Sequence, residues 1–99
     1  MKIDRDALEI QHREDARRFE IRIGDDVAVL DYYLNENTIT FTHTGVPQKM
    51  EGNGIGSLIV RAGLDHAREQ GHKVVPLCSF VDAYIRRHPE YGELAANGV

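Results

Sequence analysis

The apolar side chains of this chain change their spacing once, and the change falls at a cluster of glycines. Before the cluster they alternate with polar residues, as Phe19, Ile21 and Ile23 do, which is typical of strands with one buried face. From Ile55 onward they recur at the i, i+3, i+4 spacing of a helix with one buried face. A set of strands followed by helical segments predicts a mixed α+β fold.

Three strands are expected before the glycines, over residues 19–23, 27–34 and 39–43. The turn sequences Gly24-Asp25-Asp26 and Asn35-Glu36-Asn37 separate them, and such short connections predict an antiparallel meander. On the third strand, His43 is expected to share a face with Ile39 and Phe41. Residues 1–16 are highly charged, so we expect marginal order there, with a short strand near residues 8–10.

The segments after the glycines predict helix, strand and helix. The first helix is expected to bury Ile55, Leu58, Ile59, Ala62 and His66 and to end at Gly71. A buried strand over residues 73–78 and a helix over residues 80–87 follow, and one more turn is expected over residues 90–95. The strand–helix–strand portion should be a right-handed crossover onto the same sheet. We therefore expect one domain over residues 1–99, with an antiparallel three-strand meander followed by helix–strand–helix on a mixed central sheet.

Composition narrows the class of protein. Apolar residues make up 41% of the chain and charged residues 28%, with a formal net charge of −4, which favours a globular domain and disfavours a nucleic-acid binder. No apolar stretch approaches the roughly 18 residues that a membrane span needs, and the polar start lacks a signal-peptide pattern. Cys78 is the only cysteine, so we expect no intramolecular disulfide, no cysteine-rich zinc site and a cytoplasmic location. None of the five histidines shows H-x-x-x-H spacing with a neighbouring carboxylate, so no metal site is expected.

The glycines themselves predict an anion site. Gly52, Gly54 and Gly56 stand directly before the first helix, where unpaired N–H groups carry partial positive charge and glycine permits close approach. A phosphate or pyrophosphate is the expected ligand of the amides of residues 52–57, and the alternative is that the glycines only shape a turn. A P-loop is excluded because no lysine follows Gly56, and a Rossmann fingerprint is excluded because the preceding strands form a meander.

The order of elements and the frame from Glu51 to Gly56 resemble the GNAT acyltransferase superfamily. The more specific likeness is to small single-domain proteins described as N-acetyltransferase domain-containing, which share the segments VPLCSFV (75–81) and YIRRHPEY (84–91). The likeness covers about residues 18–94. Glu51 departs from it, because the family usually has arginine or glutamine there.

The resemblance implies transfer of an acetyl group from acetyl-CoA to an unidentified amine. It places the cofactor pyrophosphate on the amides of Gly52, Asn53, Gly54, Ile55, Gly56 and Ser57. Arg86 and Arg87 are candidates for the adenosine phosphates, unless they only solvate a helix face. The chain is too short for the helical pair that covers the acceptor site in longer members, so we expect an open acceptor side.

The catalytic candidates are Cys78, His43 and Tyr84. In the family, a backbone N–H of the strand before the loop polarises the carbonyl of the thioester, and that strand corresponds here to residues 41–46. A tyrosine in the last helix often acts as the acid in the family. This residue would be Tyr84, unless Tyr84 only packs. Cys78 precedes a helix start, where a thiol can become nucleophilic, so it is either an acyl acceptor or a small buried hydrophobe. His43 is a candidate base or partner of Cys78, unless it is a core residue. His66 and His72 are expected only to pack.

Two other functions stay open at this stage. Glu51 and the expected open acceptor side also fit a CoA-binding module without significant transferase activity. A small structural protein with a glycine turn is the third reading. CoA release that rises when an amine is added would separate the enzyme from the module, and a lack of any cofactor affinity would indicate the structural protein.

Overall fold

The strands lie in the β-sheet in the same order as in the sequence. The computed structural model describes residues 7–95. Its strands are β1 (Ile10–Arg13), β2 (Arg18–Ile23), β3 (Asp26–Asn35), β4 (Thr38–Gly45) and β5 (Lys73–Pro76). They lie in the order β1-β2-β3-β4-β5, antiparallel up to β4, with β5 parallel to β4. The expected meander and the return of the chain to the same sheet after the first helix are confirmed.

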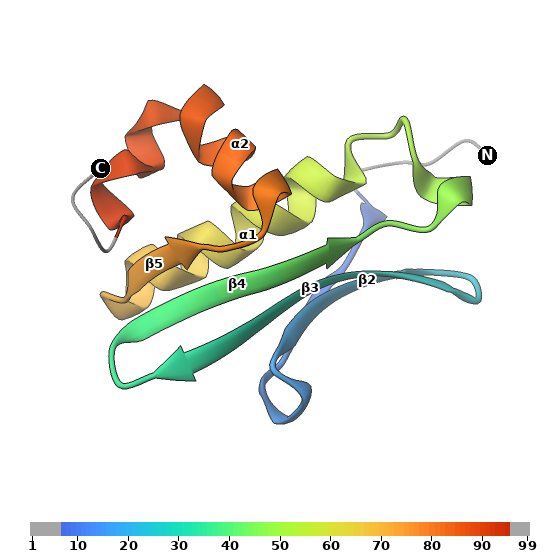
Figure 1. Ribbon diagram of the computed structural model, residues 1–99. Coiled ribbons are helices and arrows are strands. Elements are labelled where there is room, and N and C mark those ends of the chain that lie inside the picture. The colour runs from blue at the N-terminus through green and yellow to red at the C-terminus, as the bar shows by residue number, and fades with distance from the viewer. Residues whose placement is uncertain (1–6, 96–99) are drawn as a thin grey trace.

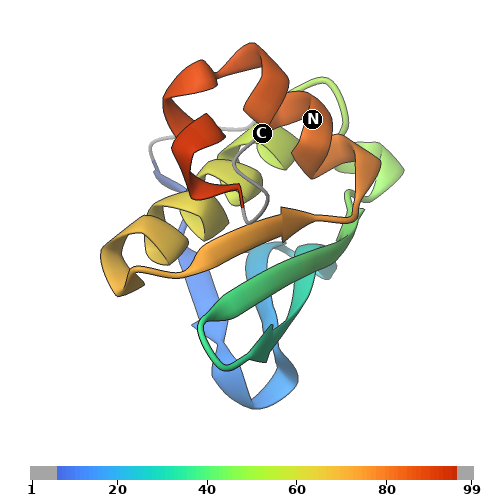
Figure 2. The same cartoon turned by 60° about the vertical axis from the view of Figure 1, so that its left-hand side comes forward.

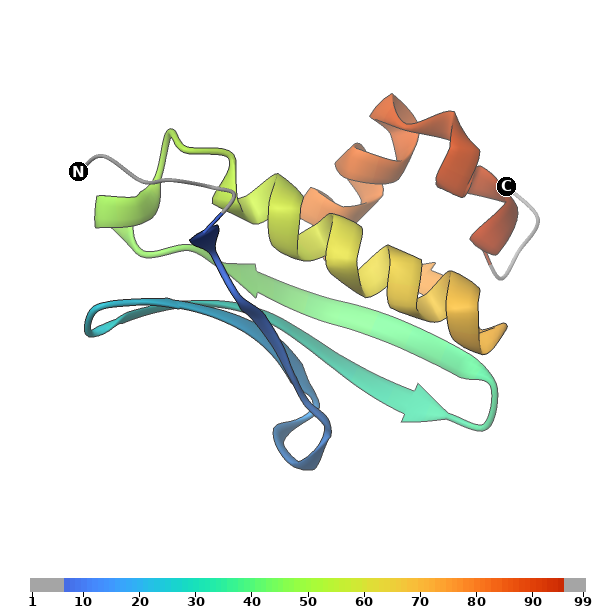
Figure 3. The ribbon, with the colours of Figure 1, turned by 180° about the vertical axis from the view of Figure 1, so that it is seen from behind.

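The helices gather on one face of this sheet. They are α1 (Ile55–Gln70) and α2 (Ser79–Arg87), and the 3₁₀ turns are η2 (Glu14–Ala16), η3 (Gln48–Met50) and η4 (Pro89–Leu94). Figures 1 and 3 show α1, α2 and η4 on the same face of the sheet, which we call the inner face. Figure 2 shows α2 and η4 lying over α1 and β5. Neither helix of the described residues has the length and apolar character that crossing a membrane requires.

The core lies between α1 and the inner face. Phe19, Leu30 and Phe41 project from the strands and are fully or almost fully buried. Opposite them, a Cβ atom added to Gly63 of α1 would stand 2.6 Å from a methyl carbon of Leu30 and 3.0 Å from the ring of Phe41. The backbone of α1 therefore rests directly on the sheet at Gly63. This contact fixes where the first turn of α1 lies relative to the end of β4.

The buried face of α1 is wider than the sequence pattern predicted. Ile55 and Ile59 are buried as expected, whereas Leu58, Ala62 and His66 are only half-buried. The remaining buried positions of the helix are Gly56, Val60, Gly63, Leu64 and Ala67. The difference arises because α1 is covered by α2 and η4 as well as by the sheet, so one flank of the helix is buried in addition to its underside.

A β-bulge interrupts the pairing of β3 with β4. Phe41 pairs with Tyr32, but the next pair joins His43 to Asp31, so Thr42 has no partner of its own in the ladder. Beyond the bulge Thr44 pairs with the inward-facing Leu30. His43 is exposed on the opposite, outer face. The expectation that His43 shares the face of Ile39 and Phe41 is therefore wrong, and Thr44 occupies that face.

The segment before β2 has more structure than its charge suggested. The expected short strand near residues 8–10 is shifted along the chain, because β1 begins at Ile10 and ends at Arg13. Its ring residue His12 stacks on Phe19, with ring centroids 4.1 Å apart, and shares a 2.6 Å hydrogen bond with the hydroxyl of Tyr32. Packing by His12 thus holds the edge strand. The same expectation for residues 1–6 lies outside the described residues.

Candidate functional site

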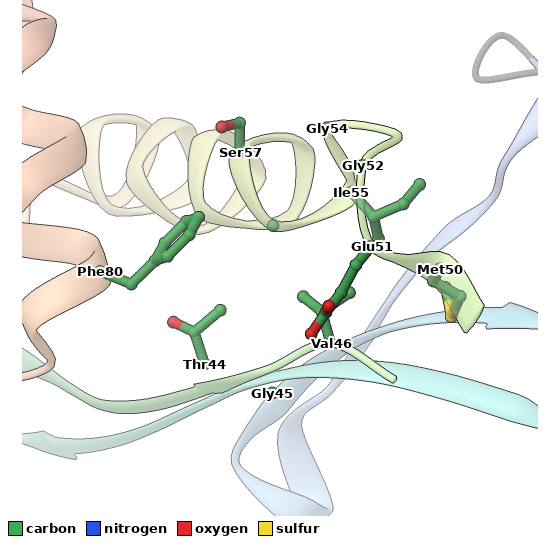
Figure 4. Close-up of a pocket in the computed structure, with 11 residues that line it drawn as sticks. Thr44, Gly45, Val46, Met50, Glu51, Gly52, Gly54, Ile55, Ser57 and Phe80 are labelled. Atoms are coloured by element: carbon green, nitrogen blue, oxygen red, sulfur yellow. The ribbon is translucent and has the colours of Figure 1, made fainter. Parts of the chain in front are cut away.

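A cleft opens where β4 and β5 part. The two strands pair only as far as Phe41 and Pro76; β4 then runs on to Gly45, while the chain after β5 turns into α2. The resulting space of about 590 Å³ lies between the end of β4 and the first turn of α1, as Figure 4 shows. Its lining residues are Thr44, Gly45, Val46, Met50, Glu51, Gly52, Gly54, Ile55, Gly56, Ser57 and Phe80.

Two different needs account for the three glycines. Gly52 and Gly54 have φ angles of +83° and +71°, a left-handed backbone that glycine adopts without the cost a side chain brings. Gly56 has ordinary helical geometry, but a Cβ atom there would stand 2.7 Å from the ring of Phe80. The first two glycines therefore shape the loop, and the third lets Phe80 of α2 pack against α1.

The first turn of α1 presents backbone donors to the cleft. Gly54 is the N-cap and offers no side chain to cap the helix, and the first intrahelical bond runs from the Leu58 N–H to the Gly54 carbonyl at 3.0 Å. The N–H groups of residues 55–57 precede that bond, so they lack intrahelical partners and carry the partial positive charge of the helix start. These three residues line the cleft, which is therefore suited to an anion.

The side chains of the cleft add no positive charge. Of the described residues that line it, Glu51 is the only ionisable one. Figure 4 shows the Glu51 side chain extending from the loop toward Val46. An anion bound here would be held by backbone amides with a carboxylate nearby.

Cys78 lies at the inner end of the fork between β4 and β5. Its N–H donates to the Phe41 carbonyl at 2.9 Å, and its Sγ lies 3.4 Å from Oγ1 of Thr44. Burial raises the pKa of the thiol, but hydrogen bonds from the Thr44 hydroxyl and from the backbone N–H groups of Val81, Phe80 and Thr44 outweigh it and lower the pKa below its ordinary value. The sulfur is therefore held in surroundings that favour the thiolate.

The family comparison identifies the class of this domain. A model of GCN5-related N-acetyltransferases matches residues 18–94. The chain belongs to this family. The GNAT resemblance found in the sequence is thereby confirmed, and so is the mixed α+β fold that it implied.

Proteins of similar length resemble this chain over most of its residues. Protein NATD1 of Danio rerio is 31% identical over 91 residues, which cover 87% of this chain and 83% of that protein. Protein NATD1 of Homo sapiens is 29% identical over 85 residues, covering 83% and 75%. The solution NMR structure of a GCN5-like protein from Staphylococcus aureus superposes with a TM-score of 0.70 at 30% identity, covering 89% of this chain and 87% of that one.

Most residues expected to hold the cofactor of this GCN5-related domain do line the cleft. They are Gly52, Gly54, Ile55, Gly56 and Ser57. Asn53 differs, because its side-chain amide donates to the carbonyls of Met50 and Glu51, each at 3.2 Å. Asn53 therefore braces the loop rather than facing the cleft.

The catalytic candidates do not meet at one point. Cys78 lies at the fork, but His43 lies on the outer face, where its Nε2 sits over Gly45. Tyr84 is buried, and its ring stacks on His88 with centroids 4.0 Å apart. Neither Tyr84 nor Cys78 is among the described residues that line the cleft. The burial of Tyr84 fits the packing role, whereas Cys78 contacts the lining residue Thr44.

The two arginines nominated for the adenosine phosphates lie in the last turn of α2. Arg86 pairs with Asp82, with 3.1 Å between Nε and a carboxylate oxygen. Because Phe80 in the first turn is the residue of α2 that lines the cleft, Arg86 and Arg87 stand well away from it.

Sequence reasoning missed Thr44 and Phe80. Thr44 faces Cys78 only because of the bulge at Thr42, and no pattern of residue types in the sequence predicts this bulge. Phe80 had a signal, since Gly56 lies inside a helix, where a glycine marks close packing by a neighbouring element.

A second hollow, of about 420 Å³, lies at the other end of α1. His12, Tyr32, His66 and His72 line it together with residues of η2 and β3. His66 and His72 thus pack beside each other, with ring centroids 6.1 Å apart. Within residues 7–95, no group of three or more histidine, cysteine or acidic side chains is arranged to hold a metal ion.

Proposed function

We propose that this GCN5-related domain binds acetyl-CoA in the cleft and transfers its acetyl group to an amine. The observation that carries the proposal is the position of Cys78. Its thiol contacts Thr44, and Thr44 lines the cleft together with the first turn of α1, whose amides have no side-chain cap. That arrangement supports an anionic cofactor at one end and a nucleophile at the other.

The cofactor pyrophosphate would bind the N–H groups of residues 55–57. Helix starts with glycines beside them are common phosphate sites, because the amides donate directly and the glycines allow close approach. The pantetheine arm would then follow β4 beyond Phe41, where pairing with β5 has ended. The backbone groups of β4 on that edge would bond the amides of the arm, as a neighbouring strand does.

The chemical step would run through Cys78. Its thiolate attacks the carbonyl carbon of the acetyl thioester, and the bond from that carbon to the CoA sulfur breaks. CoA leaves as a thiol once it has taken up a proton. A neutral amine then attacks the acetyl-cysteine, the bond from carbon to Sγ breaks, the nitrogen releases one proton to solvent, and the thiolate is restored. Thr44 holds the sulfur, and the N–H groups of Phe80 and Val81 face the charge on it.

Direct attack of the amine on the bound thioester is the alternative route. In that case Cys78 would only border the reaction centre. The covalent route needs a reduced thiol, so we place the protein in the cytoplasm as part of the proposal.

The test combines binding with intact-protein mass. Amide NMR signals of the labelled protein, titrated with acetyl-CoA, should shift first over residues 52–57. Incubation with acetyl-CoA alone should add one acetyl group to the wild type. Cys78→Ala should keep the NMR shifts and lose the mass increase, and Thr44→Val should slow acetylation at unchanged affinity. Acetylation that persists in Cys78→Ala would eliminate the covalent route, and shifts elsewhere would move the cofactor site.

The second candidate function is a CoA-binding module with little turnover. Glu51 favours it, because a carboxylate in a cleft without cationic lining opposes the tight phosphate binding that rapid catalysis uses. CoA release measured with a panel of primary amines separates the two. Release that rises with any amine supports the transferase, and a constant background rate with a bound cofactor supports the module.

A further inference from the structure

CoA brings more negative charge than the cleft alone is suited to hold. Its pyrophosphate and its 3′-phosphate together carry about four negative charges near neutral pH. Of the described lining residues only Glu51 is ionisable, and its charge has the same sign as the ligand's. If the cofactor proposal above is correct, on which this inference rests, a cation is needed beyond the rim of the cleft.

The line along which α2 packs against α1 leads away from the cleft. At its first level, the Phe80 ring of α2 lies against Gly56 of α1, next to Ser57. One turn farther along each helix stand Arg61 and Tyr84, four residues after Ser57 and Phe80. Residues four apart on a helix lie on the same side, about 5.4 Å along the axis. Arg61 therefore belongs to the same side of α1 as Ser57.

An electrostatic influence of Arg61 on Tyr84 agrees with this placement. Burial raises the pKa of Tyr84, and the positive charge of Arg61 is the strongest influence acting against that rise. Asp65, Glu90 and Arg87 also act on the Tyr84 phenol. Arg61 is exposed on α1, and its influence on Tyr84 agrees with a position on the side of α1 that faces α2.

Arg61 is also free to bind a ligand. It is exposed, and within residues 7–95 no carboxylate lies within 4.0 Å of its guanidinium. Two other arginines of this side are engaged: Arg86 pairs with Asp82 at 3.1 Å, and Arg68 stacks on Tyr91 at 4.7 Å from the ring centroid. Arg87 has no ion pair among the described residues either, but it lies in the last turn of α2, whereas Phe80 in the first turn lines the cleft. The guanidinium fork suits a phosphate better than a point charge does, because it can donate two parallel hydrogen bonds.

We propose that Arg61 binds the 3′-phosphate of CoA and so selects the free nucleotide thioester as the acyl donor. The pyrophosphate would lie on the first turn of α1, and the adenosine would extend past Phe80 over the surface toward Arg61. An acyl group on 3′-dephospho-CoA, or on the phosphopantetheine of a carrier protein, lacks the group that Arg61 recognises. Such donors would lose this contact.

Calorimetric titration with CoA and with 3′-dephospho-CoA tests the assignment. The wild type should bind CoA about tenfold more tightly, as expected for one charge-assisted contact. Arg61→Gln should weaken CoA binding by about that factor and leave 3′-dephospho-CoA unchanged. Arg61→Lys should recover part of the preference. Lys73→Gln removes one exposed positive charge at the start of β5, far from the cleft, and should keep the wild-type preference.

Each other outcome is decisive. Equal binding of both nucleotides by the wild type would overturn the role of Arg61 while leaving the cofactor site intact. Equal weakening of both nucleotides in Arg61→Gln would assign the arginine a structural role. Loss of the preference in Arg87→Gln instead would assign the phosphate to the end of α2. Binding of neither nucleotide by the wild type would remove the cofactor proposal together with this inference.

Discussion

Both ends of α1 are flanked by a glycine with a left-handed backbone, but the unpaired backbone groups at the two ends are satisfied differently. Gly54 before the helix and Gly71 after it both have φ of +71°. At the C-terminal end the chain satisfies its own groups: the His72 N–H donates to the Ala67 carbonyl at 2.9 Å, and the Asn37 side chain donates to the Gly71 carbonyl at 2.7 Å. At the N-terminal end no side chain caps the first amides.

The hollows beside these ends differ in the same way. In the histidine-lined hollow the polar groups pair with one another, as His12 does with Tyr32 at 2.6 Å and His72 with Asn37 at 3.0 Å. In the glycine-lined cleft the donors are backbone amides without such partners. Volume therefore does not separate packing from binding here. Hydrogen-bond donors without protein partners do, because such donors are available to a ligand.

The strongest test of this contrast replaces the two matched glycines. Gly54→Ala and Gly71→Ala each force a side chain into a left-handed backbone, which costs about 1 kcal/mol or more. Both should lower the melting temperature by roughly 4–8 °C for each kcal/mol. Only Gly54→Ala should also weaken acetyl-CoA binding, by about tenfold or more, since it tilts the amides that would hold the pyrophosphate.

Melting curves and calorimetry on the two variants give the answer. Similar losses of affinity in both would mean that the effect comes from stability rather than from the site. Undiminished affinity in Gly54→Ala at a lowered melting temperature would place the cofactor elsewhere.

A smaller effect is expected from the charge in the cleft. Glu51→Gln removes a carboxylate near the proposed pyrophosphate, and relief of repulsion through solvent should tighten acetyl-CoA binding by about two- to fivefold. The gain should shrink as salt is added. Glu69→Gln removes the same charge near the other end of α1 and should change the affinity little. Weaker binding by Glu51→Gln would mean that this carboxylate takes part in holding the cofactor.

The smallest effect concerns pH at the histidine-lined end. Burial lowers the pKa of His12 below its ordinary value of 6.5, His66 lowers it further, and Glu14 acts in the opposite direction. The folded state thus binds this proton less tightly than the unfolded state does. The contribution of His12 to stability is present above pH 6.5 and is lost as the pH falls through its lowered pKa.

Thermal melts at pH 5.5 and 7.5 measure this contribution. The wild type should lose more stability toward pH 5.5 than His12→Gln, which keeps a hydrogen-bonding amide beside Tyr32 but does not titrate. Affinity for acetyl-CoA at pH 7.5 should be the same in both proteins. An equal pH dependence in the two would assign the acid sensitivity to other groups.

The fold was largely predictable because its signals are local. Alternation in β2, β3 and β4 and the turn residues between them specify the meander, and the change of period at Ile55 specifies α1. The wider buried face of α1 was not predictable, since it depends on how α2 and η4 pack on its flank. The glycine cluster predicted the position of the cleft. The prediction assigned all three glycines to ligand binding, whereas Gly56 allows Phe80 to pack against α1.

The candidate site was harder to predict than the fold. Position in the sequence placed Cys78 before a helix start, and the structure confirms that position. Tyr84 was nominated by likeness alone, and its burial against His88 depends on tertiary packing. Arg61 drew no notice in the sequence, because an exposed helix arginine gains meaning only from the neighbouring helix.

The bulge at Thr42 determines which side chain of β4 lies next to the thiol of Cys78. In an uninterrupted ladder that continued from the Tyr32–Phe41 pair, Leu30 would stand opposite His43 instead of Thr44. The thiol of Cys78 would then have an imidazole beside it in place of a hydroxyl. Two candidate partners for the sulfur, His43 and Thr44, are thus adjacent in the sequence. The extra residue of the bulge determines which of them lies beside it. A one-residue slip at the end of β4 would change the acid–base character of the cleft without altering any side chain in it.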